Sequence, residues 1–372
     1  MISPENIIKT FKKNKINFFA GVPDSTLKGF ITQLTQTKGV IVRESFNEGN
    51  AVASAIGYNI SSSKIPLVYM QNSGLTNALN PLLTLAEKKP LYSIPMIFLI
   101  GLRGVKGVTQ KDKKQDEPQH ASIGPATQKI LKTLKIKTII LNVKNFNKQI
   151  KSSIAYVKKN SCPVAIIIKR GIISFSGTLE KKSFFKHKRY DYLKTLFEIK
   201  NKRDIIVATT GYSAREIYSL AENKDKNHSK IFYSVGAMGH ASQISAEIAY
   251  FSKKNKKVFM IDGDGAALMH LGSIPMIGKL KKINLVHIIV NNRAYESTGN
   301  HYMSNSKFSF KKMFKISGYD KYYVVKDLKE FKKIILKKNK GKIGIEILVD
   351  VGTINSLPRQ AHPYILKKQF KF

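Results

Sequence analysis

The chain of 372 residues contains one cysteine, no tryptophan, and only 24 acidic residues beside 64 lysines and arginines. A single cysteine, Cys162, cannot form an internal disulfide, so a secreted protein framed by disulfides is excluded and a reducing cytoplasmic setting is expected. The longest apolar run, from Ile94 to Gly101, is far too short to cross a bilayer. The N-terminal residues lack the order of a signal peptide. We therefore expect a cytoplasmic protein without membrane association.

The shortage of acidic residues leaves a formal net charge of +40, which raises the question of polyanion binding. Only eight of the basic residues are arginines, whereas proteins that read nucleic acids favour the bidentate arginine fork. The lysines are scattered as pairs through nearly every polar segment. We interpret the excess as surface composition that attracts small anions, with no specific nucleic acid as partner. A non-catalytic, lysine-rich polyanion-binding protein is the distant alternative.

Short apolar runs alternate with amphipathic segments in both halves of the chain, which is typical of βαβ units around a parallel sheet. The first half predicts strands at 16–21, 40–43, 67–70, 95–100, 137–141 and 163–168, with helices at 24–36, 48–60, 77–87, 124–134 and 146–159. The second half predicts strands at 204–209, 231–234, 257–261 and 284–290, with helices at 212–222, 239–251 and 266–278. Between them, residues 171–200 lose the alternation and predict a linker that ends in a helix. We expect two doubly wound α/β domains, 1–170 and 201–372.

Two polar clusters follow strands of the second domain. Asp264 lies between Gly263 and Gly265 after the strand 257–261, and Asn291-Asn292 follows the strand 284–290. Ligands bind at the C-terminal ends of strands in open α/β sheets, where helix N-termini offer N–H groups to phosphate. Carboxylate and amide oxygens are Mg²⁺ ligands, and a diphosphate would complete the octahedron. Taken alone, GDG and NN could each be a tight turn.

The spacing of these clusters is similar to the motif of the thiamine-diphosphate-dependent enzymes, in which NN follows GDG after about 25 residues. The resemblance implies Mg²⁺ held by the side chains of Asp264 and Asn292 and the main-chain carbonyl of Ala294. Arg293 stands where many members carry a smaller residue. Met238, after Gly236, matches the bulky apolar residue that holds the cofactor folded, with an ordinary core methionine as the alternative. Together these positions imply the thiamine-diphosphate-binding fold without a middle domain.

Glu48, at the start of the helix 48–60, matches the family's activating glutamate, which exchanges a proton with the aminopyrimidine. On an otherwise apolar helix it would be partly desolvated, which raises the pKa of a carboxyl group. The alternative is a glutamate favoured by the helix dipole in the first turn. Members of this family build each site from domains of two subunits, so the resemblance implies a homo-oligomer with active sites at the subunit interface.

Further strings extend the resemblance over most of the chain and narrow it to the phosphonopyruvate decarboxylase family. These are GVPDS at 21–25, YMQNSGL at 69–75 and DEPQH at 116–120. The resemblance implies decarboxylation of 3-phosphonopyruvate, a small anionic 2-oxo acid, to phosphonoacetaldehyde and CO2. It makes Asp24 and His120 candidates for proton transfer, and their alternatives are a helix cap and a loop histidine.

The phosphonate needs hydrogen-bond donors, and we assign Ser25, Asn72 and Arg359 as candidates. The nearest alternative is sulfopyruvate decarboxylation, since those enzymes resemble this family but often divide the two domains between subunits. Fusion in one chain favours the phosphonate. Decarboxylation of another 2-oxo acid, or carboligation, is a broader alternative.

Overall fold

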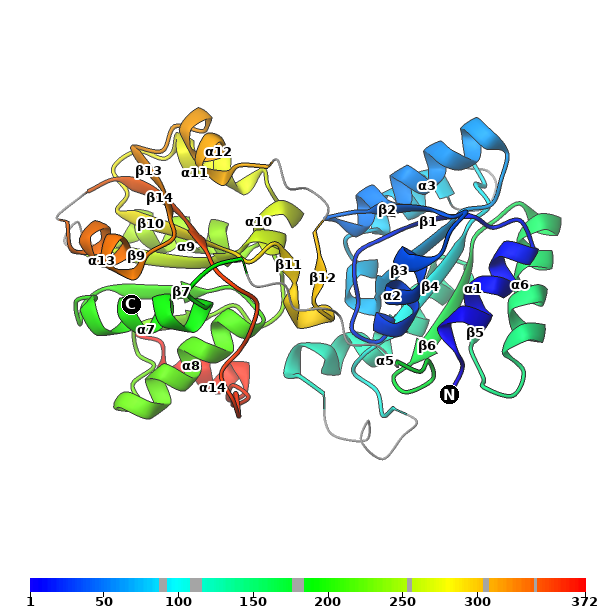
Figure 1. Cartoon of the computed structure of the whole chain (residues 1–372), viewed down its shortest axis with the longest axis horizontal. Helices are drawn as coiled ribbons and strands as arrows, with labels where there is room; N and C mark the ends of the chain where they lie inside the picture. Colours follow the sequence, from blue (N-terminus) through cyan, green and yellow to red (C-terminus); the bar gives the residue numbers. More distant parts are fainter. Residues whose placement is uncertain (87–91, 108–115, 176–183, 253–255, 304–307, 338–339) are drawn as a thin grey trace. The chain divides into compact units, whose positions relative to one another are not determined.

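A computed structural model describes residues 1–86, 92–107, 116–175, 184–252, 256–303, 308–337 and 340–372. The chain divides into two compact units, Met1–Leu179 and Glu180–Phe372. Each unit is built on a six-stranded parallel sheet (Figure 1). This is the two-domain α/β fold that the sequence predicts. Of the predicted linker, residues 176–183 lie outside the described residues, and its last part is helix α7 (Arg189–Ile199).

The first unit alternates helices and strands along its length. In chain order these are α1 (Pro4–Lys13), β1 (Phe18–Gly21), α2 (Lys28–Gln36), β2 (Ile41–Glu44), α3 (Glu48–Ser62), β3 (Leu67–Gln71), η1 (Asn72–Leu75), α4 (Leu79–Pro81), η2 (Leu82–Ala86), β4 (Ile97–Leu102), α5 (Pro118–Thr133), β5 (Lys137–Ile140), α6 (Phe146–Asn160) and β6 (Val164–Lys169).

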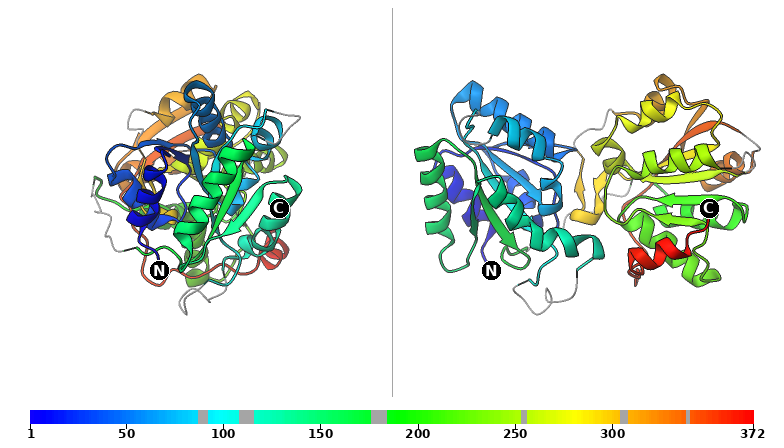
Figure 2. Two further views of the ribbon diagram at one scale, coloured as in Figure 1. Left: turned by 90° about the vertical axis from the view of Figure 1, so that its right-hand side faces the viewer. Right: turned by 180° about the vertical axis from the view of Figure 1, so that it is seen from behind.

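The central strands of this unit are buried on both faces, because helices cover the sheet from both sides. Strand β4 is buried along its whole length, as expected of a nearly continuous apolar run. One core contains side chains of α1, α2 and α6, and a second core on the other face contains side chains of α3 and α5. Figure 2 shows these helix layers from two further directions.

Four predicted details of the first unit differ from the structure. Helix α1 was not predicted, although Pro4 at its first turn is a start signal. The helix expected at 24–36 begins only at Lys28, because residues 24–27 form a turn. The helix expected at 77–87 is divided into α4 and the π-helical turn η2 beside Pro81. The helix expected at 124–134 begins earlier, at Pro118.

The second unit repeats the alternation and adds a short hairpin. Its elements are α7 (Arg189–Ile199), β7 (Ile205–Ala208), α8 (Tyr212–Lys224), β8 (Ile231–Tyr233), α9 (Ala241–Phe251), β9 (Val258–Gly263), α10 (Asp264–Met269), α11 (Ser273–Lys279), β10 (Leu285–Asn291), β11 (Ala294–Tyr295), η4 (Glu296–Thr298), β12 (His301–Tyr302), α12 (Phe310–Ile316), β13 (Lys321–Val325), α13 (Leu328–Leu336), β14 (Lys342–Leu348) and α14 (Pro363–Gln369).

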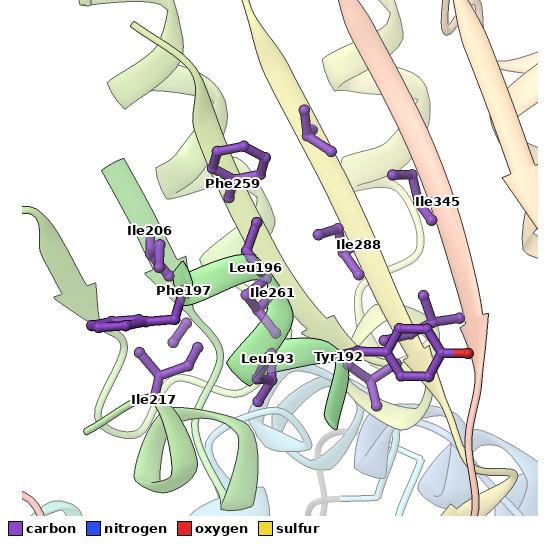
Figure 3. Packing of buried hydrophobic residues seen from close by; sticks show 14 of the residues in the cluster. Tyr192, Leu193, Leu196, Phe197, Ile206, Ile217, Phe259, Ile261, Ile288 and Ile345 are labelled. Atoms are coloured by element: carbon purple, nitrogen blue, oxygen red, sulfur yellow. The ribbon is translucent and has the colours of Figure 1, made fainter. Parts of the chain in front are cut away.

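Helix α7 is part of the core of the second unit. Tyr192, Leu193 and Leu196 are buried against the sheet, and Figure 3 shows them beside Ile261 of β9 and Ile288 of β10. The helix expected at 266–278 is interrupted after Met269, and its two parts are α10 and α11. None of the helices in the described ranges combines the length and hydropathy that a membrane span requires.

Both sheets have the same strand order. In the first unit it is β2-β1-β3-β4-β6-β5, and in the second β8-β7-β9-β10-β14-β13. The direction of winding therefore reverses between β1 and β3 and, equivalently, between β7 and β9. Open α/β sheets bind ligands at the carboxyl ends of strands around such a reversal. The sequence-predicted residues Asp24 and Asn72 follow β1 and β3, and Asp264 follows β9.

Candidate functional site

Glu48 is the first residue of α3, directly after the turn that leaves β2. Asn47 caps this helix, since its side chain accepts a hydrogen bond from the Gly49 N–H at 2.7 Å. The Glu48 carboxylate is buried and accepts from Asn77 Nδ2 at 2.8 Å. Burial raises the pKa of Glu48, and the hydrogen bond from Asn77 opposes part of that rise. A buried carboxyl with one amide donor has the environment that proton exchange with a cofactor requires.

Asp24 lies after β1 and is fully buried. Its Oδ2 accepts from the Leu27 N–H at 3.1 Å, so the carboxyl does cap the turn before α2. Its Oδ1 has no hydrogen-bond partner among the described residues. Burial raises the pKa of Asp24 to about 6, although the nearby Arg103 guanidinium opposes the shift. Capping and a proton-transfer role are therefore compatible at this position.

Arg103 follows β4 and joins the predicted site, although sequence reasoning did not single it out. Its Nη1 donates to Ser25 Oγ at 2.9 Å, and its Nε donates to Asp116 Oδ2 at 2.8 Å. Nη2 makes a second bond to Asp116, so the carboxylate holds the guanidinium in a bidentate fork. The signal that could have revealed it is its position directly after the apolar run of β4.

Asn72 follows β3 and holds Arg103 in place. Its Oδ1 accepts from the Arg103 N–H at 3.1 Å, and its Nδ2 donates to the Arg103 carbonyl at 3.1 Å and to Thr127 Oγ1 at 2.9 Å. The amide is fully buried. Because these bonds occupy both N–H donors, Asn72 holds Arg103 in place, and donating to a substrate would require it to give up one of its present partners.

His120 lies in the first turn of α5 and is buried. Its Nδ1 has no hydrogen-bond partner among the described residues. Burial lowers the pKa of His120 to about 4, and the positive charge of Arg103 contributes to the same shift. The imidazole is therefore neutral at neutral pH, and an anion bound beside Arg103 would raise its pKa again.

Asp264 begins α10, at the end of β9. It is buried, and its Oδ1 and Oδ2 accept from the N–H groups of Gly265 and Arg293, both at 2.8 Å. Burial raises the pKa of Asp264 to about 7, because only backbone donors oppose the desolvation. The bond from Arg293 connects the segment after β9 to the loop after β10. The predicted GDG and NN segments therefore lie side by side.

Asn292 is buried and points both ends of its amide at defined partners. Oδ1 accepts from the Ala294 N–H at 3.0 Å, and Nδ2 donates to Glu296 Oε2 at 2.9 Å. Arg293, which lies between Asn292 and Ala294, has a positive φ of 56°, so the loop turns sharply there. The side chain of Arg293 lies over the ring of Phe185, 5.5 Å from its centroid. The long side chain of Arg293 therefore lies beside the loop, against Phe185.

Behind Asn292 lies a buried ion-pair network that sequence reasoning missed. Arg189 donates to both oxygens of Glu216, at 2.7 and 2.8 Å, and its Nη1 donates to Glu296 Oε2 at 2.7 Å. Glu296 Oε1 also accepts from the Gly352 N–H at 2.6 Å. The only signal in the sequence is an acidic residue four positions after Asn292, because Arg189 and Glu216 are far away along the chain.

Met238 lies in the loop between β8 and α9. It is half-buried, and its neighbours Gly236, Ala237 and Gly239 have positive φ values of 82°, 44° and 85°. Met238 is not among the residues of the two hydrophobic cores described for the second unit. Gly263 has open space where a side chain would begin. Gly265 instead lies against the ring of Tyr295.

Arg359 is exposed on the segment that follows β14. Arg215 of α8 fixes this segment by donating to the carbonyls of Leu357 and Pro358 at 2.6 and 3.0 Å. Arg359 therefore belongs to the second unit, whereas Ser25 and Asn72 belong to the first. The assignment of all three to the phosphonate stays a prediction.

The donors around Asp264 fit a hard divalent cation. The buried carboxylate of Asp264 and the amide oxygen of Asn292 are the kinds of ligand that Mg²⁺ prefers when phosphates supply others. Among the described residues, no group of three His, Cys, Asp or Glu side chains gathers as a metal site.

Comparison with known proteins agrees with this geometry. The family model described as "Thiamine pyrophosphate enzyme, N-terminal TPP binding domain" matches residues 4–123, and "Thiamine pyrophosphate enzyme, C-terminal TPP binding domain" matches residues 210–342. The first match contains Glu48, and the second contains Asp264 and Asn292.

Three of the proteins that are similar in sequence to this chain are decarboxylases by name. A phosphonopyruvate decarboxylase of Streptomyces viridochromogenes is 27% identical over 80% of this chain and 76% of its own. A sulfopyruvate decarboxylase of Methanosarcina acetivorans is 26% identical over 80% of this chain and 78% of its own. The sulfopyruvate decarboxylase subunit beta of Methanocaldococcus jannaschii is 39% identical over 30% of this chain and 56% of its own. The family predicted from the motifs is thus confirmed, and the chain belongs to the thiamine pyrophosphate enzymes.

Proposed function

We propose that the protein catalyses the thiamine-diphosphate- and Mg²⁺-dependent decarboxylation of 3-phosphonopyruvate to phosphonoacetaldehyde and CO2, as a cytoplasmic step of phosphonate biosynthesis. Relatives that span both units and are named phosphonopyruvate or sulfopyruvate decarboxylase support a 2-oxo acid decarboxylase. The structural observation that supports an anionic substrate is the largely buried guanidinium of Arg103, which lies beside Ser25 and Asp24 at the strand ends of the first unit.

The second unit would hold the diphosphate end of the cofactor. Asp264, Asn292 and the carbonyl of Ala294 would bind Mg²⁺, and the glycines Gly236, Gly263 and Gly265 would leave room for the phosphates. Met238 would support the folded cofactor from its half-buried loop. When bound, thiamine diphosphate supplies an electron sink for the carbanion left by CO2.

Glu48 would exchange a proton with the aminopyrimidine. Its raised pKa suits this task, because a carboxyl group that is easier to protonate has both its protonated and its ionised form within closer reach. Asn77 keeps the carboxylate oriented through Oε2 and leaves Oε1 for the cofactor.

The anionic end of the substrate would lie against Arg103 and Ser25. Within the described residues, three of the five N–H donors of Arg103 bind Ser25 and Asp116, so two remain for an anion. Asp24, with a pKa of about 6, is the stronger candidate for delivering a proton, whereas His120, with a pKa of about 4, is neutral and would accept one only after a bound anion raises its pKa.

We also propose that the protein works as a homo-oligomer with active sites at the subunit interface, as the resemblance to its family implies. Glu48 belongs to one unit and Asp264 to the other. A net charge of +40 would attract a multiply anionic substrate and cofactor without requiring a nucleic-acid partner.

Sulfopyruvate decarboxylation is the second candidate. The relative of that name from Methanosarcina acetivorans spans both units in one chain, so fusion does not favour the phosphonate as the sequence argument assumed. Decarboxylation of a further 2-oxo acid, and carboligation, also use this chemistry.

A substrate panel tests the proposal. Purified protein with thiamine diphosphate and Mg²⁺ is expected to release CO2 from phosphonopyruvate much faster than from sulfopyruvate or pyruvate. Equal rates on all three substrates would contradict the substrate assignment. In the Asp264→Ala variant, calorimetry should show weakened Mg²⁺-dependent cofactor binding, and normal binding would contradict the ligand assignment.

A further inference from the structure

Asn292 has two chemically different amide ends, and only one of them can bind a cation. Its oxygen is a metal ligand, whereas its NH2 group is a donor and would repel Mg²⁺. The rotation of the amide therefore decides whether the site can form. The sequence motif provides an asparagine here but does not determine its rotation.

Glu296 determines the direction in which each end of the Asn292 amide points. An ionised carboxylate only accepts hydrogen bonds, so Nδ2 of Asn292 must be the atom that faces Glu296 Oε2, at 2.9 Å. Oδ1 then lies on the other side, where it accepts from the Ala294 N–H and keeps a second lone pair.

Glu296 is itself held from two directions. Oε2 also accepts from Arg189 Nη1, and Oε1 accepts from the Gly352 N–H at 2.6 Å. Its side chain is only 8% exposed. Arg189 is in turn fixed by its bidentate pair with the buried Glu216 of α8, at 2.7 and 2.8 Å. The network therefore links α7 and α8 to the loop after β10.

We infer that Glu296 is a positioning residue, which together with Arg189 fixes the Asn292 amide so that its oxygen is presented to the divalent cation. This inference rests on the proposed cofactor site. Groups that hydrogen-bond to metal ligands commonly change metal affinity by tenfold to a hundredfold when they are replaced, because they orient the ligand.

Replacing Glu296 with glutamine disturbs this orientation without changing its size. Glutamine has one donor and one acceptor end, whereas Asn292, Arg189 and the Gly352 N–H all donate to Glu296. When the glutamine turns its NH2 group toward Asn292, the asparagine amide must reverse. When the NH2 group instead faces the Gly352 N–H, the side chain loses its anchor there and no longer holds Asn292 in place. An aspartate at position 292 has two equivalent oxygens, so its rotation no longer matters. The double variant N292D/E296Q should therefore recover the cation affinity that E296Q loses.

The test measures Mn²⁺ affinity by electron paramagnetic resonance on the full-length protein saturated with thiamine diphosphate. We expect Glu296→Gln to weaken Mn²⁺ binding by roughly tenfold to a hundredfold. The double variant should bind about tenfold more tightly than E296Q. Glu198→Gln on the exposed side of α7 is the matched control and should bind as the wild type does. Thermal unfolding verifies that each variant is folded.

The possible results distinguish a failure of the proposed cofactor site from a failure of the inference about Glu296. Wild-type protein that binds no Mn²⁺ with thiamine diphosphate would overturn both the proposed site and this inference. Tight binding by the wild type and equal binding by E296Q would overturn the inference alone, as would a double variant no tighter than E296Q. Should E296Q fail to fold, Glu296→Asp takes its place, because it keeps the charge beside Arg189 and withdraws the acceptor from Asn292. Its Mn²⁺ affinity should fall similarly, and wild-type affinity would overturn the inference.

Discussion

The Glu48 carboxylate lies directly against the Cα of Gly74, so that a β-carbon at position 74 would overlap Glu48 Oε1. Gly74 belongs to the short helix η1 after β3, and Asn77 from the following turn donates to the other carboxylate oxygen at 2.8 Å. The residues that follow β3 therefore fix the position of Glu48, which follows β2.

This contact predicts that Gly74→Ala displaces the Glu48 carboxylate. We expect turnover to fall by about a hundredfold, since a shift of about 1 Å in a catalytic group has effects of that size. The matched control is Gly57→Ala in α3, where a β-carbon meets open space and should stabilise the helix by about 1 kcal/mol. Steady-state kinetics together with urea unfolding distinguish the two effects, and unchanged turnover in Gly74→Ala would contradict the placement of Glu48.

Glu48→Gln removes the titrating group but keeps its shape. Asn77 can still donate to the amide oxygen, so the fold and cofactor affinity should change little. Turnover should fall by at least about a hundredfold, because general acid–base catalysis contributes about that much or more. Calorimetry with thiamine diphosphate and single-turnover decarboxylation measure the two quantities separately. A variant that keeps the wild-type rate would exclude Glu48 from the activating role.

Asp24 should make the stability of the first unit depend on pH. Folding raises its pKa from 3.8 to about 6, so the folded state holds the proton more tightly than the unfolded state. Its favourable contribution is complete below about pH 4 and is lost as the pH rises through about 6. Asp24→Asn should therefore increase the free energy of unfolding by about 2–3 kcal/mol more at pH 7.5 than at pH 4.

Urea unfolding at the two pH values measures this difference. Asp225→Asn, at an exposed position, is the control and should show no such dependence. If the effect of Asp24→Asn is the same at both pH values, Asp24 does not carry a raised pKa in the folded protein.

Arg103→Lys should impair substrate binding more than the chemical step. Lysine keeps the positive charge but loses the fork that binds Asp116 and Ser25 together. We expect KM for phosphonopyruvate to rise about tenfold, the effect of about 1.4 kcal/mol, with a smaller change in kcat. Arg203→Lys, at an exposed position, serves as the control. Equal KM values for the two variants would remove Arg103 from the anion site.

The sequence predicted the strand ends better than the contacts between them. Apolar runs located β3, β9 and β10 within a few residues, and the motifs after them placed Asp264 and Asn292 at one edge of a sheet. Helix interiors were less certain, because Pro81 and the turn after Met269 divide segments whose periodicity is continuous.

The supporting residues could not be predicted, because their partners are distant in the chain. Arg189 meets Glu296 across 107 positions, and Asn72 meets Arg103 across 31. Local patterns contain no information about such pairs. The proximity of Gly74 to Glu48 likewise depends on how η1 leaves β3, which periodicity does not determine.

The shared strand order has a consequence for how this protein could be divided. Each unit closes two hydrophobic cores of its own, one on each face of its sheet. Within the described part of the chain, each sheet contains strands of its own unit alone. The covalent connection between the units is therefore dispensable for completing either set of cores, and each half, expressed separately, would have what it needs to fold.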